Sequence, residues 1–339
     1  MLRREFLKAG LGFAGFSVLA QGSPALADER ATCYNCPAEW ANWASVLKAF
    51  RQKTGIFVPI DNRASGMALT SLIAEKQKPV ADFVYLGGQY GAQAKAAGVL
   101  APYKPAMWDQ VPGGLKDPEG YWTALHVGTL GLFINKAALG GKPVPKSWKD
   151  LADPKYRGMI GYGEPTTAAN GYILAIAVNE AFGGSFENFD PAIKFFQSVK
   201  ANEPILPKQT AYAQVLSGEI PIFVDLDFNA YRAKYADKGP IEFVIPEEGT
   251  ISFPYVAALV SGGANPDQGK KLLDFVLSDE GQRLWSLAYV RPVRTSAMDP
   301  AIAAQFLPAS EYARAKTVDL QKVSASQPGF LARYQAEVR

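Results

Sequence analysis

The stretch Ala211-Tyr-Ala-Gln-Val-Leu-Ser-Gly-Glu-Ile-Pro-Ile-Phe-Val-Asp-Leu-Asp-Phe-Asn-Ala-Tyr-Arg232 decides how the rest of this 339-residue chain is interpreted. Thr210 can cap a short amphipathic helix that Ser217-Gly218 ends. Residues 220–224 then have the apolar pattern of a strand that is buried on both faces. Three polar residues follow its carboxyl end: Asp225, Asp227 and Asn229. Because ligands bind beyond the carboxyl ends of strands in open α/β sheets, we expect a ligand site at this edge.

The same alternation of strand and helix recurs on both sides of this stretch. Residues 82–86 and 158–162 are predicted strands, and each precedes a predicted helix after a short connection. Two longer extended stretches, residues 121–135 and 249–260, are predicted to cross between domains, and two glycines interrupt the first of them. The pattern predicts an α/β fold of two lobes, each a mostly parallel sheet flanked by helices, with the two β crossings as a hinge.

The length of the chain suits this division, since about 300 residues exceed one typical hydrophobic core. We predict a C-terminal helical segment that packs on the two lobes. The predicted boundaries are an export signal at 1–27, lobe I at 28–127 and 255–295, lobe II at 128–254, and the C-terminal segment at 296–339.

The N-terminus has the composition of a secretory signal. Met1-Leu-Arg-Arg-Glu-Phe-Leu-Lys8 is basic, residues 9–20 are uncharged, and Ser23-Pro-Ala-Leu-Ala27 fits a cleavage site after Ala27. The paired arginines resemble a twin-arginine signal, but Leu2 stands where that motif usually has Ser or Thr, so the general secretion route stays open. Twelve uncharged residues are too short for about 30 Å of hydrocarbon, which argues against a membrane anchor. We therefore expect a periplasmic protein.

The charge balance argues against nucleic acid as a partner. Removal of the predicted signal takes away three basic residues and one acidic residue, so the net charge of +3 falls to +1. A nucleic-acid-binding surface needs clustered Lys and Arg, and no such cluster occurs in the sequence.

Two cysteines, Cys33 and Cys36, have the spacing of a Cys-x-x-Cys motif. In an oxidising compartment they are expected to form a structural disulfide or to remain two inert thiols. The alternative is a periplasmic thiol oxidoreductase, because a helix is predicted from Pro37 and a helix N-terminus can lower a thiol pKa. No compact redox-domain pattern surrounds the motif, so we favour the structural interpretation.

The sequence contains no convincing catalytic or metal-binding constellation. His126 is the single histidine, and no nucleophile-elbow or phosphate-loop motif is present. We therefore expect no enzymatic activity, no metal and no cofactor. His126 is either a packed core residue or a side chain that touches a ligand at a domain crossing.

Two junctions between loop and helix have the features of anion sites. In Ala64-Ser-Gly66 the natural N-cap is Ser65, and Pro165-Thr-Thr-Ala168 offers two hydroxyls before another helix. Each places a hydroxyl and unpaired backbone N–H groups at the positive end of a helix.

Asp225 and Asp227 favour the opposite kind of partner, an ammonium, a hydroxyl or a metal. Strand alternation predicts that both carboxylates share one face if the strand continues. Together with the two anion sites they suit a ligand with unlike ends, such as an amino-phosphonate or a sugar phosphate. Nearby aromatic and basic residues that could line the site are Tyr34, Tyr85, Tyr90, Trp122, Tyr231, Arg63 and Arg291.

Several motifs together resemble a known family. With the export signal, the sequences Gly128-Thr-Leu-Gly131, Pro165-Thr-Thr167, Leu216-Ser-Gly-Glu-Ile-Pro-Ile222 and Asp274-Phe-Val-Leu-Ser-Asp-Glu-Gly-Gln282 resemble the periplasmic solute-binding proteins of ABC importers. The resemblance covers nearly all of residues 32–295. The chain resembles the branch of this family that includes binders of ferric iron, polyamines, thiamine, phosphonates and hexose phosphates. The resemblance implies a two-lobed type II fold that delivers a solute to a membrane permease driven by a separate ATPase.

The resemblance also implies a set of ligand contacts: Tyr34, Asn35, Ser65, Gly66, Gly88, Gln89, His126 to Thr129, Thr166, Thr167 and Asp225 to Asn229, including Asp227. The ferric binders use adjacent tyrosines, whereas Tyr231 and Tyr235 are separated here by Arg-Ala-Lys. A phosphonate, an organophosphate or a zwitterion is therefore expected first, with ferric iron, polyamine or thiamine as the alternative. We expect a monomer, and a sensing role would need the same closing lobes as transport.

Overall fold

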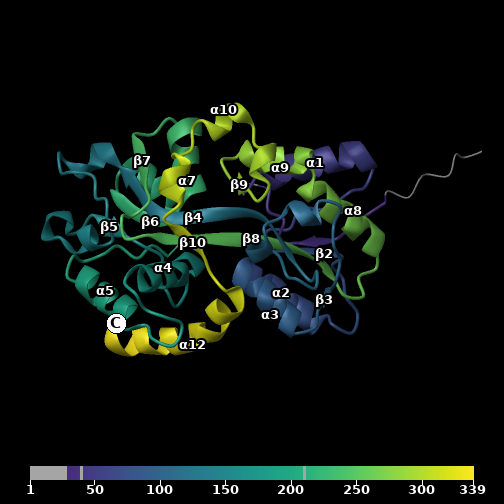
Figure 1. Cartoon of the computed structure of the whole chain (residues 1–339), viewed down its shortest axis with the longest axis horizontal. Helices are drawn as coiled ribbons and strands as arrows, with labels where there is room; N and C mark the ends of the chain where they lie inside the picture. The colour runs from purple at the N-terminus through teal and green to yellow at the C-terminus, as the bar shows by residue number, and fades with distance from the viewer. Residues whose placement is uncertain (1–28, 39–40, 209–210) are drawn as a thin grey trace, which may run out of the picture.

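Two long strands connect the two halves of the molecule (Figure 1). The structure is a computed structural model that describes residues 29–38, 41–208 and 211–339. Strand β4 (Thr123–Asn135) and strand β8 (Thr250–Val260) run from one half to the other. They pair antiparallel, with Gly128 opposite Phe253. These strands are the crossings predicted at residues 121–135 and 249–260.

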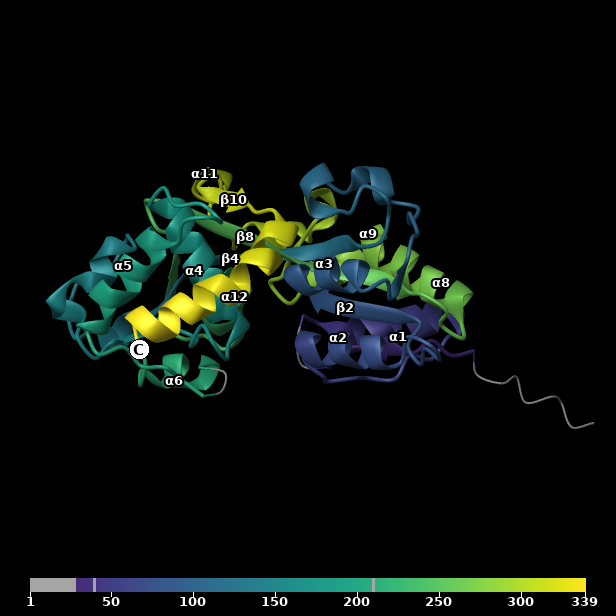
Figure 2. The ribbon, with the colours of Figure 1, turned by 90° about the horizontal axis from the view of Figure 1, so that it is seen from below.

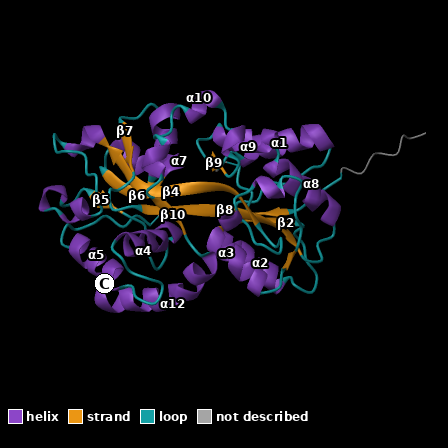
Figure 3. Ribbon diagram, viewed as in Figure 1, coloured by secondary structure: helices purple, strands orange, loops and turns teal. Residues whose placement is uncertain are grey.

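The first half is built on short strands beside β8 and β4, with helices packed against them (Figure 3). Its strands are β1 (Cys33–Tyr34), β2 (Phe83–Gly87), β3 (Leu100–Ala101) and β9 (Arg291–Pro292). Its helices are α1 (Trp43–Thr54), α2 (Ser65–Ala74), α3 (Gly88–Ala96), α8 (Pro266–Leu277) and α9 (Asp279–Ser286). Trp43 lies at the centre of this core, with ring centroids 5.1 Å from Tyr85 and 4.9 Å from Trp285.

The second half surrounds the other end of β4. Its strands are β5 (Ile160–Gly161), β6 (Ile222–Leu226) and β7 (Ile241–Val244). Its helices are α4 (Ala169–Ala181), α5 (Asp190–Lys200), α6 (Tyr212–Ser217) and α7 (Asp227–Tyr231), and a π-helical turn (Arg232–Ala236) follows α7. Gly131 is required where β4 pairs with β6 and β7, because a Cβ there would lie 2.5 Å from Phe243 Cζ.

The predicted two-part α/β architecture is present, but the sheets are mixed rather than mostly parallel. Among the described strands, β1 pairs parallel with β2, β5 with β6, and β10 (Ala315–Thr317) with β8. The pairs that involve β4 are antiparallel, and so is the pair of β2 with β8. The physical reason is that the chain leaves the first half along β4 and returns along β8, so the two crossings run in opposite directions.

The C-terminal segment packs on both halves (Figure 2). It contains α10 (Pro300–Ala303), α11 (Ala309–Tyr312), β10 (Ala315–Thr317) and α12 (Leu320–Glu337). At α12, Ser324 Oγ accepts a hydrogen bond of 2.9 Å from Gln93 in α3, and the Val323 carbonyl accepts one of 2.7 Å from Tyr172 in α4. The lobe boundaries at 28–127, 128–254 and 255–295 remain a prediction.

Local backbone conformation corrects one predicted helix. Helix α1 begins at Trp43 rather than Pro37, because Ala41 and Asn42 adopt left-handed conformations with φ of 50° and 62°. The predicted stop at Gly55 is observed, with φ of 77°. The export signal at 1–27 and the cap Thr210 lie outside the described residues.

Short 3₁₀ helices occupy several connections: Trp108–Gln110, Gly113–Leu115, Lys136–Leu139, Lys149–Ala152, Pro154–Tyr156 and Thr295–Ala297. No helix in the described part of the chain is both long enough and apolar enough to cross a membrane.

Candidate functional site

A cavity of about 350 Å³ lies between the two halves, next to the crossing strand β8. Its volume is in the range of small-molecule sites. The lining from the first half is Asn35, Pro37, Ala64, Ser65, Gly66, Tyr85, Gly87, Gln89 and Tyr90; β8 contributes Phe253 and Tyr255; the second half contributes Thr167, Ala169 and Ile173. A larger cavity of about 550 Å³ is lined by residues of the second half alone, so it does not join the halves.

Three helices begin at the cavity between the halves. The lining includes the first turn or the cap residue of α2 (Ser65–Ala74), α3 (Gly88–Ala96) and α4 (Ala169–Ala181). The N-terminus of a helix carries partial positive charge and unpaired backbone N–H groups. The convergence of three such ends from both halves makes this cavity electrostatically suited to an anion.

Ser65 does not act as the predicted N-cap of α2, since the cap position is Ala64. Its Oγ instead accepts hydrogen bonds from the Gly87 backbone N–H at 3.1 Å and from Asn35 Nδ2 at 3.2 Å. A hydroxyl has two acceptor lone pairs and one proton. Because both lone pairs are used, the Ser65 hydroxyl can offer its proton as a hydrogen-bond donor at the cavity.

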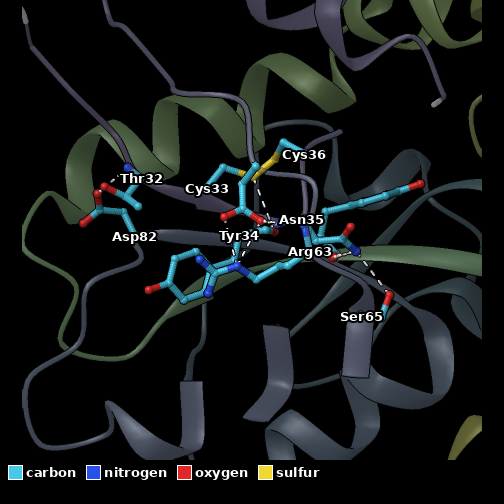
Figure 4. Close-up of a disulfide and its surroundings, with 10 residues drawn as sticks. Thr32, Cys33, Tyr34, Asn35, Cys36, Arg63, Ser65 and Asp82 are labelled. Carbon is cyan, nitrogen blue, oxygen red and sulfur yellow. Dashed lines mark hydrogen bonds and ion pairs between the residues drawn. A yellow bond between two sulfur atoms is a disulfide. The ribbon is translucent and has the colours of Figure 1, made fainter. Parts of the chain in front are cut away.

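The orientation of the Asn35 amide follows from its partners. Nδ2 also donates to the Tyr85 carbonyl at 2.7 Å, and a carbonyl can only accept, so the nitrogen must stand on that side. Both amide protons are therefore engaged, one with the Tyr85 carbonyl and one with Ser65. Figure 4 shows Asn35 beside Ser65. This leaves Oδ1 as the acceptor group that Asn35 contributes to the lining.

Gln89 carries a second acceptor, and this one is buried. The side chain is 2% exposed, and its Oε1 has no hydrogen-bond partner among the described residues. A buried acceptor without a partner costs about 1–3 kcal/mol. A donor group on a bound ligand would remove that cost.

His126 lies behind the cavity lining rather than in it. Its Nε2 is 2.5 Å from Tyr85 Oη, and its ring stacks on Tyr255 with centroids 5.1 Å apart. Burial lowers the pKa of His126 to about 3, so the imidazole is neutral near pH 7. His126 therefore supports two lining aromatics, Tyr85 and Tyr255.

The condition under which Asp225 and Asp227 would share one face, a strand that continues past Leu226, is not met. The alternation of strand β6 ends at Leu226, because the chain turns into α7 at Asp227. Asp225 accepts a hydrogen bond from Asn229 at 2.8 Å, and burial raises its pKa to about 6. Asp227 is fully buried and accepts from the Thr129 backbone N–H at 3.0 Å and from Tyr312 at 3.2 Å. Neither carboxylate belongs to the cavity lining.

Four other predicted site residues are not part of this lining and have partners of their own. Tyr34 donates to Glu75 at 2.8 Å, and Gly88 packs against Leu320 and Pro254. The Thr129 hydroxyl lies 3.0 Å from that of Ser252, and Thr166 bonds the carboxylate of Glu164. Asn229 lines a separate cavity of about 260 Å³, which also contains Arg232 and Tyr289.

From the predicted contacts, the cavity brings together Asn35, Ser65, Gly66, Gln89 and Thr167, and from the predicted aromatic candidates Tyr85 and Tyr90. Which of these contact a ligand remains a prediction. Sequence reasoning did not single out Ala169, Ile173, Phe253 or Tyr255. The signal for two of them was present, because Phe253 and Tyr255 are two residues apart in a predicted crossing strand, and that spacing places them on one face.

Cys33 and Cys36 are joined in a disulfide. Their exposed fractions are 2% and 0%, and Cys36 does not begin a helix. The features that activate a redox thiol, exposure and a helix N-terminus, are therefore missing at this bridge. The described residues also contain no group of three or more His, Cys, Asp or Glu placed to hold a metal ion.

Comparisons with known proteins agree with this architecture. A model of the family described as bacterial extracellular solute-binding proteins matches residues 78–325. A putative 2-aminoethylphosphonate-binding periplasmic protein of Salmonella typhimurium is 27% identical, over 85% of this chain and 82% of its own length. The major ferric iron-binding protein of Neisseria gonorrhoeae is 28% identical, over 79% of this chain and 81% of its own.

Among solved structures, the periplasmic binding protein AfuA of Actinobacillus pleuropneumoniae, with fructose 6-phosphate bound, superposes with a TM-score of 0.77. It is 25% identical, and the match covers 91% of this chain and 98% of AfuA. The chain thus belongs to the bacterial extracellular solute-binding protein family, and its fold is that of the type II periplasmic binding proteins that serve ABC importers.

Proposed function

We propose that this protein is the receptor of an ABC importer, and that it captures a small polar solute between its two lobes. A phosphonate, an organophosphate or a zwitterion is favoured. The observation that carries the proposal is the meeting of three helix N-termini at one cavity together with the Ser65 hydroxyl, whose two lone pairs are already occupied. A phosphonate or phosphate group accepts hydrogen bonds from backbone N–H and from O–H donors, and it is stabilised by helix dipoles.

The acceptors in the lining favour a ligand that also carries donors. Asn35 Oδ1 and Gln89 Oε1 suit an ammonium or hydroxyl group, which an amino-phosphonate or a sugar phosphate would bring. The relative named for 2-aminoethylphosphonate and the solved neighbour with fructose 6-phosphate are both consistent with a ligand of this kind.

Ferric iron, polyamines and thiamine are the alternative ligands. One relative is named for ferric iron. Hard cations and polyamines are usually bound by negatively charged oxygen ligands such as carboxylates. The cavity lining contains no carboxylate, which argues against iron and polyamines. Of the three lining phenols, Tyr85 already bonds His126. An organic anion therefore fits the lining better.

The protein is exported to the periplasm and delivers its solute to a membrane permease. Residues 1–27 serve as an export signal that is removed after Ala27, by the twin-arginine or the general route, and the mature monomer acts in the periplasm. It binds its solute without chemical change and passes it to the membrane permease. N-terminal sequencing of the periplasmic form tests the cleavage site, with Asp28 expected as the first residue.

A thermal-shift panel on ligand-stripped protein tests the ligand class. The panel contains 2-aminoethylphosphonate, fructose 6-phosphate, inorganic phosphate, spermidine, thiamine and ferric citrate. A true ligand at 100 times its Kd should stabilise the protein by about 2.7 kcal/mol. Stabilisation by ferric citrate alone would favour the iron alternative. No shift with any compound would contradict the proposed function.

A further inference from the structure

We propose that the Cys33–Cys36 disulfide is a positioning element of the ligand cavity: it holds Asn35 in place and, through Asn35, sets the direction of the Ser65 hydroxyl. The inference deepens the proposed function and rests on it for its effect on affinity.

The disulfide encloses Asn35 within a short covalent ring (Figure 4). Cys33 is in β1 opposite Phe83 of β2, and the backbone of Cys36 pairs with that of Asp61 in an isolated antiparallel β-bridge. The two cysteine Cα atoms are 6.2 Å apart, and between them Asn35 adopts a left-handed backbone conformation with φ of 65°. Residues other than glycine adopt this conformation at a cost, although asparagine tolerates it better than most. The disulfide ring offsets this cost because it restricts the other backbone conformations that Asn35 could adopt.

A hydrogen bond to Asp61 restrains the same backbone noncovalently. The Asn35 N–H donates to Asp61 Oδ1 at 3.0 Å, and Arg63 Nε contacts the two carboxylate oxygens of Asp61 at 3.0 and 2.9 Å. Asp61 and Arg63 are both partly exposed, and ion pairs of this kind contribute little by themselves. The disulfide adds a covalent restraint to the Asn35 backbone beside this hydrogen bond.

The position of Asn35 determines what Ser65 can do. From its left-handed conformation the amide reaches both Ser65 Oγ and the Tyr85 carbonyl. If the ring opens and Asn35 relaxes to negative φ, Ser65 regains a free lone pair, and its proton can turn away from the cavity. The cavity then loses one oriented donor and the Asn35 acceptor together.

A double-mutant cycle tests the coupling by calorimetry with 2-aminoethylphosphonate and fructose 6-phosphate. C33A/C36A opens the ring, and N35G keeps the left-handed backbone without the amide. Each is expected to weaken binding about tenfold, and their combination should weaken it no further, since both act through one side chain. Asn179 is a matched control, because its buried amide bonds the carbonyls of Ser185 and Asn188 away from the cavity. N179A should lower thermal stability but leave affinity unchanged.

Nuclear magnetic resonance of the ligand-free protein tests the positioning even if neither compound binds. The side-chain NH₂ of Asn35 should exchange slowly with solvent in the wild type and rapidly in C33A/C36A. Three outcomes would each overturn the inference: unchanged exchange in C33A/C36A, unchanged affinity in C33A/C36A, or an affinity loss of about a hundredfold in the combined variant. The two proposals can also fail separately. If exchange is slow in the wild type and fast in C33A/C36A, but the wild type binds no panel compound, the proposed function is contradicted and the positioning role stands.

Discussion

Thr129, in the crossing strand β4, donates its backbone N–H to Asp227 Oδ1 over 3.0 Å. Asp227 is fully buried at the start of α7, where Tyr312 of the C-terminal segment also donates to it at 3.2 Å. One carboxyl group therefore connects the strand between the halves, a helix of the second half and the C-terminal segment. Its ionisation should affect the stability of the whole second half.

Asp227→Asn should change the pH dependence of stability. Burial raises the pKa of Asp227 from 3.8 to about 6, so the folded protein holds this proton more tightly than the unfolded chain does. The contribution of the protonated group to the free energy of unfolding is then present below about pH 4, is lost as pH rises to about 6, and stays constant above that. Urea unfolding of the wild type and D227N from pH 4 to 8 measures the difference.

The same burial effect at Asp225 provides an internal check, since its pKa is also raised to about 6. D227N should keep part of the decline between pH 4 and 6, and D225N/D227N should lose more of it. An unfolding curve for the double variant with the full wild-type pH slope would contradict the assignment of this slope to the two carboxyls.

Ser65→Ala should weaken ligand binding more than it weakens the fold. The variant loses the hydroxyl proton that faces the cavity and the acceptor for Gly87 and Asn35. We expect an affinity loss of about tenfold and a stability loss of about 1 kcal/mol, the usual net value of a hydrogen bond. Isothermal calorimetry and thermal unfolding give the two numbers. Ser71→Ala, in the same helix but outside the cavity lining, is the control, and an equal loss of affinity in both variants would count against a donor role for Ser65.

Tyr85→Phe should destabilise the protein without charging His126. The substitution removes the 2.5 Å hydrogen bond to His126 Nε2, which should cost about 1–3 kcal/mol because both groups are buried. His126 should remain neutral, since burial is what lowers its pKa to about 3. Urea unfolding measures the first effect, and the pH dependence of the His126 ring resonances measures the second. Titration of His126 between pH 5 and 8 in Y85F would show that the hydrogen bond, rather than burial, keeps it neutral.

Two glycine substitutions should act in opposite directions. A Cβ on Gly131 in β4 would lie 2.5 Å from both Phe243 Cζ and the Val244 carbonyl oxygen, whereas one on Gly329 in α12 meets nothing within 4 Å. Gly131→Ala should therefore cost about 1–3 kcal/mol through overpacking. Gly329→Ala should add about 0.5–1 kcal/mol through helix propensity. Chemical denaturation gives both values, and a Gly131→Ala variant as stable as the wild type would show that β7 can move away from β4.

Much of the fold was predictable because its signals are local. Two long extended stretches, the first interrupted by glycines, predicted the crossings that β4 and β8 form, and Gly55 predicted the end of α1. The hydroxyls at Ser65 and Thr167, each beside the start of a helix, pointed to residues that now line one cavity. Patterns of this kind depend on the periodicity of one element, which a few neighbouring residues establish.

The roles of individual side chains were not predictable in the same way. Periodicity would place Asp225 and Asp227 on one face only if the strand continued, whereas the chain turns into α7 at Asp227. A capping rule assigned Ser65 to its own helix, whereas Asn35 and Gly87, 30 and 22 residues away, occupy its oxygen.

By itself the sequence determined the order of strands and helices, the two crossings and the family, because each depends on residues close together in the chain. Only the tertiary structure decided which polar groups meet at the cavity, how their hydrogen bonds are directed, and that α12 packs on both halves. The physical reason is that a hydrogen-bonding group takes whichever partner the packing of distant segments brings within reach, and sequence order does not specify that partner.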